Sequence, residues 1–218
     1  MRSVIVTLVS AIVAGLLLVP GFASAKAVTL TVPDEVGDIG IIFDFETYLP
    51  ISTWGKNSQI AQAGYFDRTL FWFGLRGNTY TFGMELAGGL PQEGDPLAPG
   101  VTLVEYVLWL DKEAWDWVTP VESYFKLVFR YDGVRYSAAL LDWPSLTVKM
   151  FLPFTIDGPR FEMEFSAESI DNIENFWLFT SVDVYLGELR NGLPWMVDAF
   201  DLDSVEGQIV TSIPWPPR

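Results

Sequence analysis

The sequence predicts an all-β protein, an antiparallel two-sheet β-sandwich of immunoglobulin-like or jelly-roll type. Glycine-containing turns at Gly77-Asn78, Asp132-Gly133 and Asp157-Gly158 each separate two segments whose apolar residues alternate. The segment Val101–Asp111 is apolar on both alternating faces, which is typical of a central strand covered on both sides. A closed β-barrel is the alternative arrangement of the same strands.

The first residues have the features of an export signal. Arg2 precedes a charge-free, mostly apolar run from Val4 to Val19, which ends near the small-residue triplet Ala23-Ser24-Ala25. These features predict a secretory signal peptide over residues 1–25, and an uncleaved membrane anchor is the alternative. Residues 26–218 contain no linker and no repeat of fixed period, so we expect a single secreted domain.

Composition excludes several kinds of chemistry. The chain has no cysteine and no histidine, which removes disulfides, thiol catalysis, Ser-His-Asp catalysis and the usual zinc sites. Its net charge of −15 repels nucleic acid and anionic lipid, so we expect neither nucleic acid nor, after signal cleavage, a membrane as partner. Aromatic residues make up 15 % of the chain, which suits both sheet interiors and surfaces that stack on sugars.

The segments before the first hairpin predict two short strands and a loop. Residues 26–32 alternate between apolar and small or hydroxyl side chains, and Pro33 ends this first strand. Ile41–Phe45 is a second apolar run. Leu49–Gly64 has no period and contains proline, glycine and asparagine, which predicts a long surface loop.

The first hairpin has a register that can be derived from its turn. A two-residue turn at Gly77-Asn78 pairs Phe73 with Phe82 and places Trp72 opposite Gly83. One face of this hairpin is then apolar, and Trp72 lies on the other face. The inner face consists of Phe71, Phe73, Leu75, Tyr80, Phe82 and Met84.

The second hairpin, with a two-residue turn at Asp132-Gly133, pairs Tyr131 with Val134 and opposes Arg130 to Arg135. Two arginines directly opposed are unfavourable, so we expect a carboxylate beside them.

The third hairpin turns at Asp157-Gly158 and pairs Phe154 with Phe161. Pro153 cannot donate to a ladder, so its strand must lie at an edge or carry a bulge. Beyond this hairpin, Ser166–Asn175 predicts a short helix with Ser166 as its N-cap, and Phe176–Leu186 predicts another strand.

A series of short motifs along these strands resembles a known group of sandwich domains. The motifs are Asp34-x-x-Gly37-Asp38, Tyr80-x-Phe82-x-Met84-x-Leu86-Ala87-Gly88-Gly89-Leu90-Pro91, Glu105-Tyr106-x-Leu108-Trp109-x-Asp111, Tyr131-Asp132-Gly133 and Ile156-Asp157-Gly158. Their order resembles the DOMON-like group, which includes the family-9 carbohydrate-binding modules. The resemblance spans most of residues 33–186 and implies an immunoglobulin-like sandwich that binds sugars, haem or calcium in different members. We expect no haem, since there is no histidine to act as axial ligand and Met84 is predicted to lie inside.

Two groups of side chains are candidates for binding. A carbohydrate site needs a ring presented flat beside hydroxyl or carboxylate groups, and several tryptophans fall outside the predicted inner faces. These are Trp54, Trp72, Trp115, Trp117 and Trp143, and the alternative is that they cover the ends of the sandwich. Calcium prefers oxygen ligands from closely spaced loop acids, and the alternative for such acids is simple solvation. The acids in question are Asp34, Glu35, Asp38, Asp44 and Glu46.

An enzyme would have to use carboxylates. Glu105 and Asp111 flank an aromatic strand, but six residues of strand at ~3.3 Å each separate them by about 20 Å. A glycosidase needs its two carboxyl groups about 5 to 9.5 Å apart, so these two cannot form that pair. We expect Glu105 to meet a lysine or arginine instead.

The function that the sequence predicts is therefore that of a secreted, non-catalytic binding domain for an extracellular glycan or surface protein, with calcium as a candidate stabiliser. The alternative is a cell-surface or filament subunit that assembles through sheet edges, with residues 26–32 adding a strand to a neighbour. A carboxylate-dependent glycoside hydrolase ranks after both.

Overall fold

A computed structural model describes residues 27–34, 41–44, 49–53, 64–114, 122–186, 195–199 and 212–217 of the 218-residue chain. Within residues 41–44, 49–53 and 195–199 and at Leu186 the description covers the backbone alone. The predicted signal peptide over residues 1–25 lies outside the described residues. Among the described residues, no helix has the length and apolar character needed to cross a membrane.

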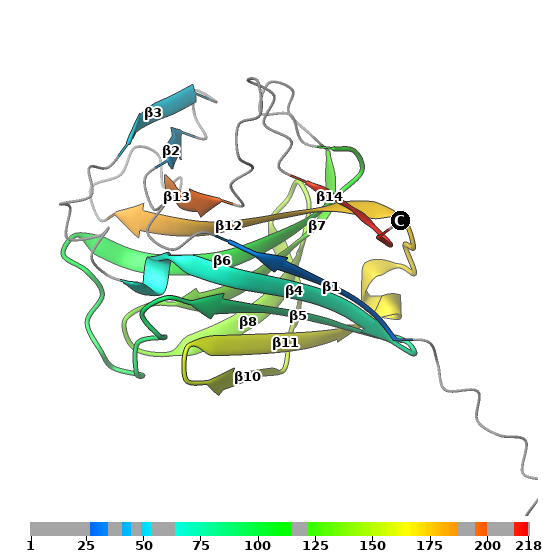
Figure 1. Cartoon of the computed structure of the whole chain (residues 1–218), viewed down its shortest axis with the longest axis horizontal. Helices are drawn as coiled ribbons and strands as arrows, with labels where there is room; N and C mark the ends of the chain where they lie inside the picture. The colour runs from blue at the N-terminus through cyan, green and yellow to red at the C-terminus, as the bar shows by residue number, and fades with distance from the viewer. Residues whose placement is uncertain are drawn as a thin grey trace, which may run out of the picture.

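The strands form two antiparallel sheets that pack face to face, which confirms the predicted β-sandwich (Figure 1). Sheet A has five strands in the order β1 (Val28–Pro33), β4 (Arg68–Arg76), β5 (Thr79–Leu86), β11 (Arg160–Ser166) and β10 (Phe154–Asp157). Each sheet has its own edge strands, β1 and β10 in sheet A and β3 and β9 in sheet B. The alternative of a closed barrel is therefore wrong for this fold.

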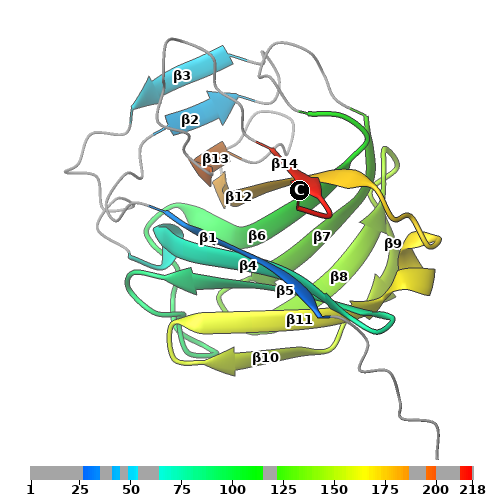
Figure 2. The ribbon, with the colours of Figure 1, turned by 45° about the vertical axis from the view of Figure 1, so that its right-hand side comes forward.

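Sheet B has nine strands. Its path is β3 (Leu49–Thr53), β2 (Ile41–Asp44), β13 (Trp195–Ala199), β12 (Phe176–Leu186), β6 (Val101–Asp111), β7 (Ser123–Tyr131), β8 (Tyr136–Asp142) and β9 (Thr147–Phe151), and β14 (Ile213–Trp215) also pairs with β12. Two short 3-10 helices, η1 (Gly64–Phe66) and η2 (Ala167–Ile170), connect strands. Turned by 45°, the molecule shows β12 and β6 of sheet B lying across β1, β4 and β5 of sheet A (Figure 2).

The strand β6 is central to sheet B, as the sequence predicts. It has the predicted bounds and pairs with β12 on one side and β7 on the other. Its even-numbered side chains, such as Tyr106 and Leu108, point into the core between the sheets, where both are fully buried. Phe129 of β7 and Phe161 of β11 stack there with ring centroids 4.2 Å apart, so aromatic packing joins the two layers without any disulfide.

The hairpin of β4 and β5 has the predicted register. Phe73 pairs with Phe82 and Trp72 with Gly83, and the predicted inner face is buried except for Leu75, which is half-buried. Gly77 adopts a φ of 63°, which is the left-handed conformation that a turn with glycine first requires.

The register predicted for the hairpin of β7 and β8 is wrong by two residues. Tyr131 pairs with Tyr136, not with Val134, because residues 132–135 form a four-residue loop. The Asp132 carboxylate accepts hydrogen bonds from the backbone N–H groups of Val134 and Arg135, both at 2.9 Å, and so closes the longer loop. Because side chains alternate between the two faces of a strand, a register shift of two residues leaves each side chain on its predicted face.

The third hairpin is also shifted, and its first strand is divided. Asp157 pairs with Arg160, so the turn is Gly158-Pro159 and Phe154 pairs with Met163 instead of Phe161. The chain crosses from sheet B to sheet A at Leu152-Pro153, between β9 and β10, and both strands lie at sheet edges. The prediction that Pro153 marks an edge is therefore confirmed.

Three other sequence predictions concern β3, the N-cap of η2 and the strand β12. The predicted loop over residues 49–64 begins with the strand β3, so that prediction is wrong for residues 49–53. The predicted N-cap is confirmed, since the Ser166 hydroxyl accepts from the Ser169 backbone N–H. The strand β12 has the predicted bounds.

Candidate functional site

The outer face of sheet A carries rows of side chains that face away from the core. Strand pairing aligns the residues of the middle row as direct neighbours across all five strands. In strand order this row reads Thr31, Trp72, Gly83, Glu162 and Thr155. A next row contains Leu70, Glu85, Arg160 and Asp157. An aromatic ring therefore lies on this face among hydroxyl and charged groups.

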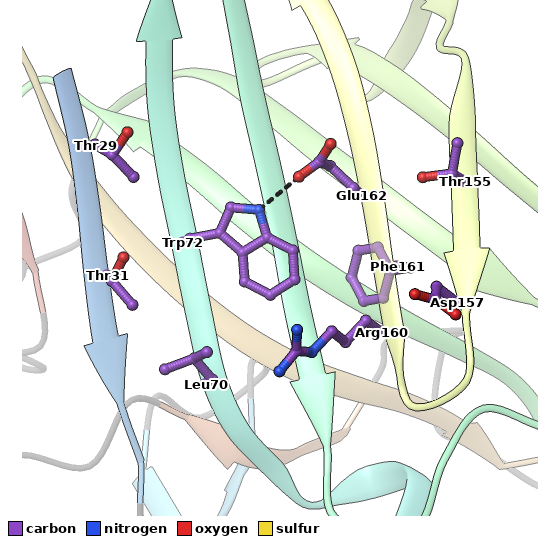
Figure 3. A pocket seen from close by; sticks show the side chains of 9 residues that line it. All are labelled: Thr29, Thr31, Leu70, Trp72, Thr155, Asp157, Arg160, Phe161 and Glu162. Carbon is purple, nitrogen blue, oxygen red and sulfur yellow. Dashed lines mark hydrogen bonds between the residues drawn. The ribbon is translucent and has the colours of Figure 1, made fainter. Parts of the chain in front are cut away.

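Trp72 lies with its indole ring over Gly83 of the adjacent strand (Figure 3). A Cβ atom placed on Gly83 would stand 2.2 Å from Trp72 Cζ2, so no larger residue fits beneath the ring in this position. On the far side of Gly83, the Glu162 carboxylate accepts a hydrogen bond from Trp72 Nε1 at 2.8 Å. The glycine and the carboxylate together hold the ring across the strands.

A hollow of about 440 Å³ surrounds this ring, and we call it the sheet A groove. Threonine hydroxyls, carboxylates and a guanidinium line it together with the indole. The polar lining residues are Thr29, Thr31, Thr155, Asp157, Arg160 and Glu162. Figure 3 shows them on β1, β11 and β10 around Trp72 of β4, with β1 on one side and β10 on the other. The groove combines an aromatic platform with hydrogen-bond donors and acceptors on both sides.

Of the five tryptophans predicted for a binding site, Trp72 and Trp143 lie within the described residues. Trp72 is half-buried on the outer face, as the sequence predicts. Trp143 follows β8 in sheet B and packs edge-to-face on Trp109, with ring centroids 5.0 Å apart. The two tryptophans therefore belong to different sheets and do not share a site. Trp54, Trp115 and Trp117 lie outside the described residues.

One predicted calcium ligand has another partner. Asp34 Oδ2 binds Arg68 at 2.8 Å from Nε and 2.5 Å from Nη2, and Nη1 of the same arginine donates to Thr180 Oγ1 on β12. This buried pair links sheet A to sheet B, so Asp34 has a structural role. Among the described residues, no group of three acids is placed to hold a metal ion.

The other predicted ligands leave the calcium prediction open. Glu35, Asp38 and Glu46 lie outside the described residues, and of Asp44 only the backbone is described. Calcium binding stays a prediction, which melting in calcium and in chelator would test.

A second polar cluster lies on the outer face of sheet B, and we call it the sheet B cluster. It consists of Glu105, Lys126, Arg130 and Asp183. Lys126 Nζ lies 2.9 Å from Glu105 Oε2, and Arg130 Nη2 lies 2.7 Å from Glu105 Oε1, which confirms that Glu105 meets basic partners. This cluster includes an acid pair that the sequence does not reveal, because Asp183 pairs with Glu105 across β12 and β6.

Burial and charge determine what this acid pair can do. The side chains of Glu105 and Asp183 are 4 % and 0 % exposed. Burial raises the pKa of Asp183 to about 6, against the opposing effect of Lys126. Burial also acts to raise the pKa of Glu105, but Lys126 and Arg130 hold it below its ordinary value. Two enclosed, charge-compensated carboxylates offer no face to a substrate, which favours a structural role.

The strand β6 ends in another buried acid. Asp111 is 3 % exposed and accepts a hydrogen bond from the Ser123 hydroxyl at 2.6 Å. Burial raises its pKa to about 7, against the opposing effect of that hydrogen bond.

No family model, curated protein sequence or solved structure matches this chain. The resemblance to the DOMON-like group therefore rests on the motifs of the sequence and stays a prediction.

Proposed function

We propose that this protein is a secreted, non-catalytic carbohydrate-binding domain that binds an extracellular glycan in the sheet A groove. One observation carries the proposal: the Trp72 ring lies across Gly83, where the hydroxyls of Thr31 and Thr155 and the carboxylate of Glu162 share its row. The axial C–H groups of a pyranose pack on an aromatic face, and its hydroxyl groups need donors and acceptors around that face.

The surroundings of the ring support this use. The Trp72 Nε1–Glu162 Oε2 hydrogen bond fixes the ring before any ligand arrives, so less conformational entropy is lost on binding. The threonine side chains are short and can donate and accept, which suits ligands rich in hydroxyl groups. The DOMON-like resemblance independently implies a sandwich that binds sugars in some of its members.

The test is a glycan array followed by calorimetry with the strongest ligand. The Trp72→Ala protein should lose at least about tenfold in affinity, because it loses the platform. Trp143→Ala is the matched control, since it removes a tryptophan that packs on sheet B, and it should bind normally. An array without any ligand, or full affinity in Trp72→Ala, would overturn the proposal.

A second candidate function is assembly through sheet edges, and a specific surface favours it. The edge strands β9 and β10 expose apolar side chains, with Phe151 72 % exposed and Ile156 41 % exposed. An exposed apolar edge is a site for strand pairing between chains. Light scattering should then show oligomers that Ile156→Lys converts to monomers, and a monomer at high concentration would exclude this function.

A further inference from the structure

The side chains around Trp72 carry an excess of negative charge. Asp157 and Glu162 line the sheet A groove, and Arg160 is the cation in its lining. The Arg160 guanidinium is already bound to the Glu85 carboxylate, at 2.7 Å from Nη2 and 2.8 Å from Nε. Within the described part of the chain, no basic side chain forms an ion pair with Asp157 or Glu162.

This charge lies beside an aromatic face. An ammonium group is attracted to the face of an indole, and to a carboxylate at the ring's edge. Glu162 occupies that edge, since its Oε2 accepts from Trp72 Nε1 (Figure 3). A carboxylate or sulfate on a ligand would instead meet like charge at the same position.

We infer that the sheet A groove selects glycans with free amino groups, such as oligomers of β-linked glucosamine, over neutral and acidic glycans. This inference rests on the proposed carbohydrate-binding function. Trp72 stacks on the pyranose ring, and the carboxylates of Glu162 and Asp157 accept hydrogen bonds from ammonium groups of the bound oligomer.

Calorimetry on the full chain tests the inference with three oligosaccharides of equal length, made of glucosamine, N-acetylglucosamine or galacturonic acid. At mildly acidic pH, where the sugar amines are protonated, the glucosamine oligomer should bind at least about tenfold more tightly than its acetylated form. The difference should shrink at high salt, because the groove is open to solvent. The galacturonic acid oligomer should bind most weakly.

Variants locate the effect in the groove. Glu162→Gln and Asp157→Asn should each weaken glucosamine binding about threefold to tenfold and barely change binding of the acetylated oligomer. Glutamine retains an acceptor for Trp72 Nε1, so the ring should keep its position. Glu174→Gln is the matched control, an exposed acid outside the groove lining, and it should have no effect. Arg160→Gln removes a cation and should tighten glucosamine binding.

The possible outcomes separate this inference from the proposed function. Equal affinity for the glucosamine and acetylated oligomers, with both lost in Trp72→Ala, would overturn the amine preference and leave carbohydrate binding intact. An amine preference that survives in a protein carrying both Glu162→Gln and Asp157→Asn would also overturn it, because the net charge of −15 would then account for the attraction. Binding of none of the three oligomers would overturn the amine preference, and a glycan array without any ligand as well would overturn both.

Discussion

The outer faces of the two sheets use charged residues in opposite ways. On sheet A, Glu162 and Arg160 lie around an open groove and contact neighbours at its surface. On sheet B, Glu105, Lys126 and Asp183 are buried and directed at one another. A charge in solvent can exchange water for a ligand at small cost, whereas a buried charge must keep its partner. The sheet A face is therefore suited to binding and the sheet B face to stability.

The largest test of this difference is to break the sheet B cluster. Lys126→Ala leaves the Glu105 and Asp183 carboxylates buried with Arg130 as the remaining cation among the cluster residues. We expect the free energy of unfolding to fall by about 3–5 kcal/mol, measured by urea denaturation.

Arg160→Ala on sheet A is the control for that measurement. Its ion pair lies in solvent, with the arginine side chain 56 % exposed, so its removal should change stability by less than about 1 kcal/mol. Equal losses in the two variants would contradict the distinction between the two faces.

A second prediction concerns the platform of sheet A. In Gly83→Ala the new methyl group would collide with the Trp72 ring and with the Phe161 carbonyl oxygen, 2.6 Å away. We expect a loss of about 1–3 kcal/mol in stability and a loss of glycan affinity of at least about tenfold, because the ring must move.

Gly74→Ala is the matched control, on the same outer face of the same sheet. Its Cβ would meet only ordinary contacts at 3.4 Å and beyond. A Gly83→Ala protein that is as stable and binds as tightly as Gly74→Ala would show that the ring position does not matter.

The sequence predicts that Trp72 lies opposite Gly83 in the groove, but it does not predict that Glu162 lies beside them. The two-residue turn at Gly77-Asn78 is enough to predict the Trp72–Gly83 pairing. In the hairpin of β7 and β8, the predicted register is wrong by two residues, but every side chain still lies on its predicted face. Glu162 reaches this row because β11 pairs with β5, and that partnership joins segments far apart in the sequence. No local pattern encodes such pairing, and the same holds for Glu105 and Asp183 across β6 and β12.

The last prediction uses pH to distinguish the two faces. Burial raises the pKa of Asp111 to about 7 in the folded protein, against an ordinary value of 3.8. Between about pH 4 and 7 the folded state keeps a proton that the unfolded chain has released. The free energy of unfolding therefore falls as the pH rises through this window, by at most about 1.4 kcal/mol per pH unit. Asp183, with its pKa raised to about 6, adds a slope of the same sign between about pH 4 and 6.

Asp111→Asn removes this titration and keeps an oxygen that can accept the Ser123 hydrogen bond. In urea denaturation at a series of pH values, the free energy of unfolding of the variant should increase relative to that of the unmodified protein as the pH rises from 4 to 7. Glu164→Gln, an exposed acid of sheet A, should give a curve parallel to that of the unmodified protein. Parallel curves for Asp111→Asn as well would mean that Asp111 ionises freely in the folded state. Asp111 would then be no example of the difference between the buried charges of sheet B and the solvent-exposed charges of sheet A.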